Sequence, residues 1–250
     1  MCNVMKKMAC LILPALIFIF FFNGVADKGP SRRKFKKLES GEENLIKPEA
    51  APAINRLQQI SKDKHFTMWV GWWQKCIPGF SLNKMEDLGE FPVDNEPADF
   101  AAADKIKKGP GGILYKNSPD GKKYINPYWG RLVYKWKDDD WWPYFESQCG
   151  AELYEPSQKK STIVLKCYTK DGLEGAFWVD KDRVVLMGYD SVTRQMSVEC
   201  ETVESCVAPS VWILDLKSAT LNQHRGTIVK RSACDLDGYL KTAMTKFFGK

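Results

Sequence analysis

The stretch STIVLKCYTKDGLEGAFWVDKDRVVLMGY, residues 161–189, decides the fold. Its runs of β-branched and aromatic residues are interrupted only by short polar segments at 170–172 and 180–182, which are typical of tight turns. The same pattern predicts strands at 161–168, 175–179, 183–189, 195–200, 211–216 and 226–231. Strands that follow one another without long helices between them form an antiparallel meander. The second half of the chain therefore predicts a mainly β fold.

Upstream of this stretch the strand pattern continues. Residues 113–115 and 123–125 flank the segment Asn117-Ser118-Pro119-Asp120-Gly121, in which Gly121 suits the positive φ angle of a hairpin turn. Residues 129–136 alternate and predict another strand, followed by a turn at 137–140. The aromatic segment His65–Trp73 also alternates and predicts a strand with tryptophan on both faces. Residues 76–96 show no period and predict a long loop.

Three segments have helical spacing instead. They are 53–64, 97–108 with Pro97 near its start, and 235–248. About nine strands are too many for one flat sheet, so we expect an antiparallel meander closed as a barrel or packed as a two-sheet sandwich. Short helices precede it, and the C-terminal helix covers an edge or an open end. Residues 53–250 are expected to form this single β-rich domain.

The first 26 residues indicate a membrane address. Lys6 and Lys7 precede an apolar run from Ala9 to Phe22, and Gly24-Val25-Ala26 follows. The run is shorter than the roughly 20 residues of a spanning helix, which favours a cleaved secretory signal over residues 1–26. The alternative is an uncleaved anchor over residues 9–25. Six cations between Lys28 and Lys37 favour that alternative, because flanking cations bias which end stays inside.

The charge distribution excludes a nucleic-acid-binding domain. The net charge of +6 includes two lysines in residues 1–26 and a net +5 in 27–37, so residues 38–250 carry −1. The segment 27–52 therefore predicts a basic and then Pro/Ala-rich linker. Its cations from Lys28 to Lys37 are suited to contact an anionic membrane surface.

Cysteine usage fits an exported protein. Six cysteines remain after residues 1–26, an even number that suits a disulfide framework: Cys76, Cys149, Cys167, Cys200, Cys206 and Cys234. Only Cys200 and Cys206 are paired by their spacing. Zinc binding is disfavoured because the sequence has no C-x-x-C pair, and we expect no metal and no other cofactor.

No catalytic motif is present in the sequence. It lacks the G-x-S-x-G, H-E-x-x-H and phosphate-loop patterns. His65 at a strand start and His224 in a predicted turn at 222–226 are interpreted as exposed or hydrogen-bonded residues, and Asp235 to Gly238 as a helix start. We therefore expect no catalytic residue. An alternative is a hydrolase with paired carboxylates such as Asp139 and Glu146.

Aromatic clusters are the positive signal for function. The candidate ligand-binding residues are Trp69, Trp73, Trp141, Trp142 and Tyr144. Exposed tryptophans beside carboxylates suit sugar rings or apolar or cationic ligands, whereas core packing is the alternative explanation. The leading hypothesis is an exported, periplasmic or secreted, non-enzymatic β domain that binds an envelope glycan, lipid or protein through an aromatic surface. The second is a membrane-tethered envelope scaffold.

Overall fold

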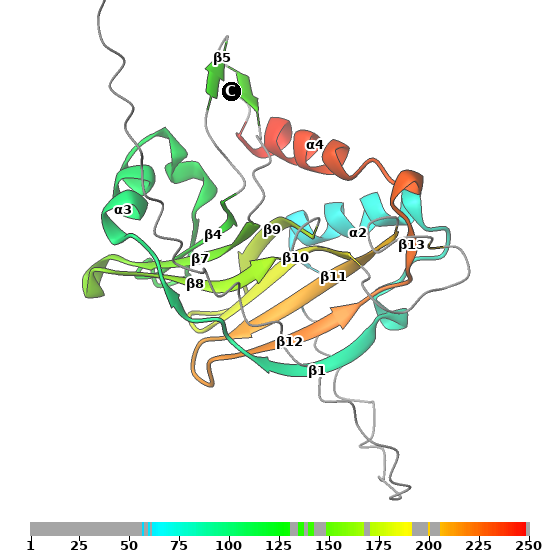
Figure 1. The fold of residues 1–250 in the computed structure, drawn as a ribbon, viewed down its shortest axis with the longest axis horizontal. Coiled ribbons are helices and arrows are strands. Elements are labelled where there is room, and N and C mark those ends of the chain that lie inside the picture. Colours follow the sequence, from blue (N-terminus) through cyan, green and yellow to red (C-terminus); the bar gives the residue numbers. More distant parts are fainter. Residues whose placement is uncertain are drawn as a thin grey trace, which may run out of the picture. The chain divides into compact units, whose positions relative to one another are not determined.

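The fold is seen in a computed structural model that describes residues 57, 60, 62–130, 135–137, 140–142, 149–167, 171–191, 200 and 206–248 (Figure 1). All of these belong to the unit Lys47–Lys250, and the unit Met1–Ile46 lies outside them. The helices are α2 (Lys64–Cys76), α3 (Phe100–Lys108) and α4 (Leu236–Phe248). The strands are β1 (Glu86–Pro92), β2 (Glu96–Pro97), β3 (Lys116–Asn117), β4 (Tyr124–Trp129), β5 (Lys135–Lys137), β6 (Asp140–Trp142), β7 (Cys149–Glu155), β8 (Lys160–Cys167), β9 (Gly172–Trp178), β10 (Arg183–Ser191), β11 (Cys206–Asp215), β12 (Thr220–Arg225) and β13 (Val229–Lys230).

Two antiparallel sheets form the body of the domain. The first has the order β1-β12-β11-β10-β9, with β13 paired to β11, and the second has the order β2-β8-β7-β4-β3. The strand predictions at 161–168, 175–179, 183–189 and 211–216 are confirmed by β8 to β11. The hairpin turn predicted around Gly121 is confirmed between β3 and β4, with Gly121 at a φ of 69°. The strand expected at 113–115 is wrong, because Pro110–Leu114 form a 3-10 helix and the strand begins at Lys116.

The sheets pack face to face as a sandwich. Alternate residues of β10 and β11, such as Leu186 and Leu214, meet Ile125 and Leu153 of the second sheet in one buried cluster. Strand alternation explains the division, because neighbouring residues such as Val185 and Met187 lie on the opposite face of β10. The fold class predicted from the sequence is thus confirmed in its sandwich form.

Helices cover the outer faces of both sheets. Helices α2 and α4 pack on the outer face of the first sheet, on the same side (Figure 1). Phe66, Trp69 and Trp73 from α2 join Tyr239 of α4 in that core. Helix α3 packs its Ala103 against tyrosines of the second sheet. The expected C-terminal helix is therefore confirmed, but its predicted place at an edge or an open end is wrong, because it covers the face of a sheet.

The strand predicted at His65–Trp73 is wrong, because this segment forms α2. Asp63 caps the helix by accepting hydrogen bonds from the backbone N–H groups of His65 and Phe66 at 2.7 and 3.1 Å. Phe66, Trp69 and Trp73 follow at spacings of three and four residues, so one helical face buries all three rings. The preference of aromatic residues for strands is a packing preference, and packing is satisfied here by a helix.

The loop predicted at 76–96 is also wrong in part. Residues Glu86–Pro92 form β1, an edge strand that pairs with β12 and has an irregular register between Asp87 and Glu90. Gly89 lies in this irregularity with a φ of 89°. Glycine and proline are tolerated at a sheet edge with a bulge. Because the same residues are typical of loops, the sequence predicted a loop here instead of an edge strand.

Two further boundaries differ from the predictions. Helix α3 begins at Phe100 after the N-cap Asp99, and Pro97 belongs to strand β2. The turn predicted at 222–226 is wrong, because Asn222 to Arg225 lie in β12 and His224 is 2% exposed. The strand predicted at 226–231 is reduced to β13, and Gly226 lies between the two strands with its N–H bonded to the carbonyl of Pro209.

Several predictions fall outside the described residues. These concern residues 1–52, the greater part of the helix 53–64, residues 131–134 of a predicted strand and 195–199 of another. Of the helix at 53–64, Leu57 and Ile60 are described and both are buried. Among the described residues, no helix is long and apolar enough to cross a membrane.

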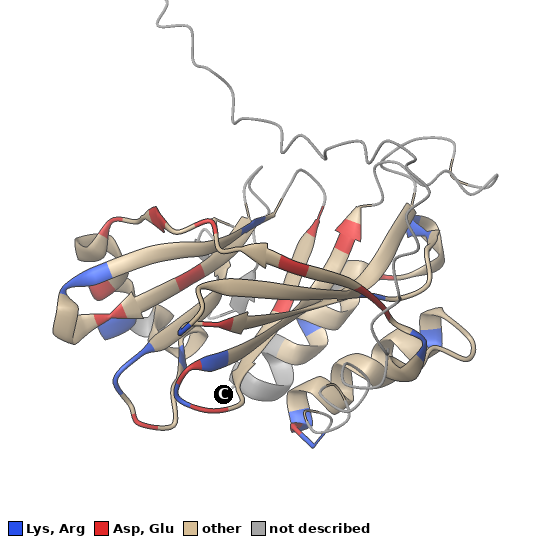
Figure 2. Cartoon of the chain, turned by 90° about the horizontal axis from the view of Figure 1, so that it is seen from below, with Lys and Arg blue, Asp and Glu red and all other residues tan. Residues whose placement is uncertain are grey.

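Charged residues of both signs are interspersed over the domain. Figure 2 shows acidic and basic positions side by side at turns, with acidic positions also within strands. This agrees with the near-neutral sum over residues 38–250.

Candidate functional site

Trp69 and Trp73 lie in the core between α2 and the first sheet. Both are 0% exposed, so the expectation that these two rings lie on a surface is wrong. Their indole N–H groups donate to one carboxylate oxygen, Oε2 of Glu174, at 2.7 and 3.3 Å. Glu174 is 2% exposed. The two tryptophans thus hold a buried acidic side chain.

A β-bulge brings Glu174 to this position. Met187 of β10 pairs with Gly175 of β9, but the next residue, Gly188, pairs with Leu173, so Glu174 is the extra residue. A bulge interrupts strand alternation and redirects one side chain. This redirection places Glu174 beneath α2, whereas its neighbour Leu173 stays in the core between the sheets.

Further polar groups adjoin Glu174. The hydroxyl of Tyr128 on β4 donates to its backbone carbonyl at 3.1 Å. Tyr239 of α4 is 1% exposed, and its burial followed by the nearby charge of Glu174 raises the pKa of its hydroxyl. We call Glu174, Trp69, Trp73 and Tyr239 the buried acidic cluster.

Two thiols lie beside this cluster. Cys76 is the last residue of α2 and Cys234 precedes α4, and both belong to the core under the helices. Their side chains are hydrogen-bonded to each other. Burial raises the pKa of the Cys234 thiol, and the Cys76 thiol and the charge of Glu174 act in the same direction.

The other four of the six predicted cysteines form two disulfides. Cys149 of β7 and Cys167 of β8 are directly opposite in the antiparallel register, with 5.0 Å between their Cα atoms. Cys200 is bonded to Cys206 at the start of β11, with 5.7 Å between Cα atoms. One bond therefore staples the second sheet, and the other closes a short loop at the first.

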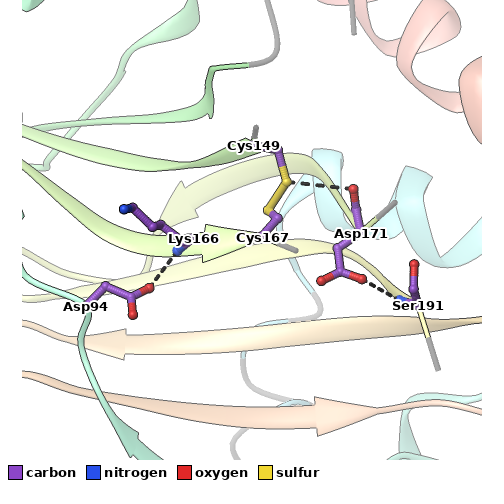
Figure 3. Close-up of a disulfide and its surroundings, with 6 residues drawn as sticks. All are labelled: Asp94, Cys149, Lys166, Cys167, Asp171 and Ser191. Atoms are coloured by element: carbon purple, nitrogen blue, oxygen red, sulfur yellow. Dashed lines mark hydrogen bonds between the residues drawn. A yellow bond between two sulfur atoms is a disulfide. The ribbon is translucent and has the colours of Figure 1, made fainter. Parts of the chain in front are cut away.

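Polar side chains gather near the Cys149–Cys167 bond (Figure 3). The carboxylate of Asp171 accepts the backbone N–H of Ser191 at 2.6 Å, and the backbone carbonyl of Asp171 lies 3.7 Å from the Cys149 sulfur. The carboxylate of Asp94 accepts the backbone N–H of Lys166 at 2.6 Å. These hydrogen bonds tie the segment before β2 to β8, and the segment before β9 to the end of β10.

Asp190 on β10 is the most perturbed acid of this region. Burial, and then the charge of Asp171, raises the pKa of Asp190 to about 7. Arg225 and hydrogen bonds from Gln223 and Ser210 oppose this rise by favouring the charged form. A carboxyl group with a pKa near neutrality can exchange a proton under physiological conditions.

The remaining predicted ligand-binding residues lie in or near a short hairpin. Strands β5 and β6 pair only with each other and form a third sheet, separate from the sandwich sheets (Figure 1). In the backbone register Trp136 is opposite Trp141, and Trp142 is opposite Lys135. We call residues 135–137 and 140–142 the tryptophan hairpin. Tyr144, and the carboxylates Asp139 and Glu146 of the hydrolase alternative, lie outside the described residues.

No metal centre is formed by the residues that the structure describes. Within that part of the chain, no three side chains of His, Cys, Asp or Glu are grouped closely enough to hold a metal ion. His65 lies in the first turn of α2 and His224 is buried in β12.

The chain was compared with known protein families, curated proteins and solved structures. No known protein family, curated protein or solved structure matches the chain. The interpretation of the site therefore depends on its own chemistry.

Sequence reasoning missed Glu174 and Asp190. Glu174 follows Leu173 in a stretch that reads as strand, and Asp190 follows Tyr189 at the end of another. An acidic residue inside an apolar strand was the available signal, because a buried carboxylate needs polar partners. The partners themselves, two tryptophans about a hundred residues upstream of Glu174, become apparent only in the folded chain.

Proposed function

We propose that this chain is an exported, disulfide-stapled β-sandwich that binds a glycan of the cell envelope through the tryptophan hairpin. Residues 1–26 would direct export, and residues 27–52 would link them to the domain. The single observation that carries the proposal is the hairpin itself, which has three tryptophans among its six described residues and whose strands pair only with each other.

Export is supported by the two disulfides. Disulfides persist in oxidising compartments and are rare in the cytosol. The bond between Cys149 and Cys167 links adjacent strands, and the bond between Cys200 and Cys206 closes a loop of sequence separation 6. Both are positioned as structural bonds, which fits a domain that works outside the reducing cytosol.

The residue types of the hairpin favour a glycan over a membrane or a protein. Asp140 of β6, and Asp138 and Asp139 just before it in the sequence, would be repelled by anionic lipid headgroups. A stable protein interface usually needs about 20 to 30 residues on each side, far more than this hairpin offers. Sugar rings need flat apolar faces beside hydrogen-bonding groups, and the hairpin combines tryptophan with lysine and aspartate.

Titration of the full-length exported protein with purified envelope polysaccharide tests this proposal. Replacement of Trp136, Trp141 or Trp142 by alanine should weaken binding at least about tenfold, which is typical of central aromatic contacts. The change in intrinsic fluorescence on binding should decrease in parallel.

Trp72→Phe is the matched control. The Trp72 indole nitrogen is buried and has no hydrogen-bond partner within the described residues, so phenylalanine removes no bond. This variant should bind as the parent does. Binding to anionic vesicles instead of polysaccharide, or unchanged affinity in all three hairpin variants, would contradict the proposal.

A further inference from the structure

The thiol pair Cys76 and Cys234 differs from the other four described cysteines of the domain. Those four are disulfide-bonded, whereas Cys76 and Cys234 are free thiols that contact each other through a hydrogen bond. Both thiols also belong to the core under α2 and α4, where Cys234 is buried and Cys76 packs against the same cluster, so a bond between them would join two parts of one packed core.

The backbone on both sides of the pair is fixed. Cys76 ends α2, and the next residue, Ile77, caps the helix by donating its N–H to the carbonyl of Trp73 at 2.8 Å. Cys234 donates its N–H to Arg231 and accepts the N–H of Leu236. The two thiols are therefore held together by two ordered segments rather than by a chance approach of loops.

Helix α2, which ends at Cys76, and helix α4, which follows Cys234, already pack together. Trp72 of α2 stacks edge-on against Tyr239 of α4, with 6.1 Å between ring centroids. Together α2 and α4 cover the buried acidic cluster. A covalent link at this point would fasten both helices over Glu174.

We propose that Cys76 and Cys234 form a third disulfide in the working protein, joining α2 to the segment that begins α4. This inference rests on the oxidising compartment of the proposed function. It goes further in pairing Cys76 with Cys234 and in giving this bond the role of a clamp on the two helices. The free thiols of Cys76 and Cys234 are then the reduced form of the bond.

The chemistry requires an oxidant, and a small-molecule or protein disulfide is the class that fits. Cys76 is partly exposed, so its thiolate attacks one sulfur of the oxidant, forms a mixed disulfide and releases one thiolate. Cys234 then attacks the Cys76 sulfur, and the second thiolate leaves. The two protons of the protein thiols end on the two released thiolates, so the oxidant is reduced by two electrons and the protein gains one S–S bond.

Mass spectrometry of the full-length protein from its native host tests the pairing. The protein is denatured with a thiol-alkylating reagent and without reductant, then digested. We expect a linked peptide pair that contains Cys76 and Cys234, lighter than the two separate peptides by two hydrogen atoms. Alkylated Cys76 and Cys234 beside intact 149–167 and 200–206 links would overturn the inference and leave export standing.

A different result separates the two proposals. Alkylation of all six cysteines would contradict export instead. In that case incubation of the purified protein with oxidised glutathione decides the pairing, since selective formation of the 76–234 link supports it and any other pairing overturns it.

A stability measurement tests the clamp independently. The variant Cys76→Ala/Cys234→Ala should lose roughly 1 to 3 M in its urea midpoint relative to the oxidised parent, because the bond closes a long loop of the unfolded chain. The urea midpoint of the variant should be close to that of the parent protein in which only the Cys76–Cys234 bond has been reduced. Equal midpoints for the oxidised parent and the variant would overturn the clamp.

Discussion

Glu174 shows how much a single buried side chain requires of its surroundings. An ionised carboxylate loses its hydration in the core, and hydrogen bonds must replace it. Trp69 and Trp73 supply two of them, which explains why two large indoles lie fully buried with their polar edges toward the sheet. The aromatic cluster of α2 is therefore also a polar site.

Substitution of Glu174 should reveal this dependence. Glu174→Leu leaves two buried indole N–H groups without their acceptor and should lower the free energy of unfolding by about 2 to 4 kcal/mol. Glu174→Gln keeps an acceptor oxygen and should cost less. Urea denaturation followed by circular dichroism measures both, and a leucine variant as stable as the glutamine variant would contradict the expectation.

Asp190 makes stability depend on pH. Its pKa is raised to about 7 in the folded state, so the folded protein holds this proton more tightly than the unfolded chain does. The resulting stability is fully present below the unfolded pKa of about 4 and is lost as the pH rises through about 7. At about 1.4 kcal/mol per pKa unit, this is a decrease of a few kcal/mol.

The variant Asp190→Asn should remove this decrease. Its free energy of unfolding should change less than that of the parent between pH 4 and 8, and at pH 8 it should be the more stable protein. Asp171→Asn is the companion variant, because loss of the neighbouring charge should move the transition of the parent to lower pH. Identical pH profiles for parent and Asp190→Asn would show that this group does not titrate near neutrality.

At the scale of elements, the bulge between β9 and β10 positions the site. Gly188 is required there, because a Cβ atom at this position would collide with the carbonyl oxygen of Gly172 and lie 2.9 Å from the Cα atom of Leu173. Strands β9 and β10 can thus approach this closely only when position 188 is glycine. The bulge then presents Glu174 to the helices.

Replacement of this glycine should disturb the bulge. Gly188→Ala should destabilise the protein by about 1 to 3 kcal/mol or more through overpacking against backbone, and should change the fluorescence of the tryptophans over Glu174. Gly71→Ala in α2 is the control, since nothing lies within 4 Å of the added Cβ atom and alanine favours a helix by up to about 1 kcal/mol. If Gly188→Ala and Gly71→Ala destabilised the protein equally, the expectation that the bulge requires glycine at position 188 would be contradicted.

The sequence predicted an element correctly where the spacing of its apolar residues fits only one type of secondary structure. Strands β8 to β11 and helix α4 were predictable because the strands are rich in β-branched and apolar residues and are separated by polar turns, and because the helix has a clear apolar stripe. Helix α2 was not, because its tryptophans satisfied a two-residue and a three-to-four-residue period equally well. Strand β1 was missed because edge strands accept the same residues as loops.

At the scale of the whole molecule, the mainly β fold and one of the two disulfides follow from local pattern and cysteine spacing, but the Cys149–Cys167 pairing and the site do not. The link between Cys200 and Cys206 is short-range and was expected from spacing. The partners of Glu174 come from α2, β4 and α4, and such long-range placement depends on the packing of helices on sheets. No local pattern of residues encodes it.

The packing of α2 on α4 sets the order in which the domain can be completed. Trp72 near the start of the described chain finds Tyr239 only when the final helix is present. During synthesis α2 emerges long before α4, so its tryptophans lack the contact with α4 until that helix has been made. Contacts between such distant parts of a chain close slowly. The contact between α2 and α4, and with it the complete cover over Glu174, can therefore form only after α4 has been synthesised.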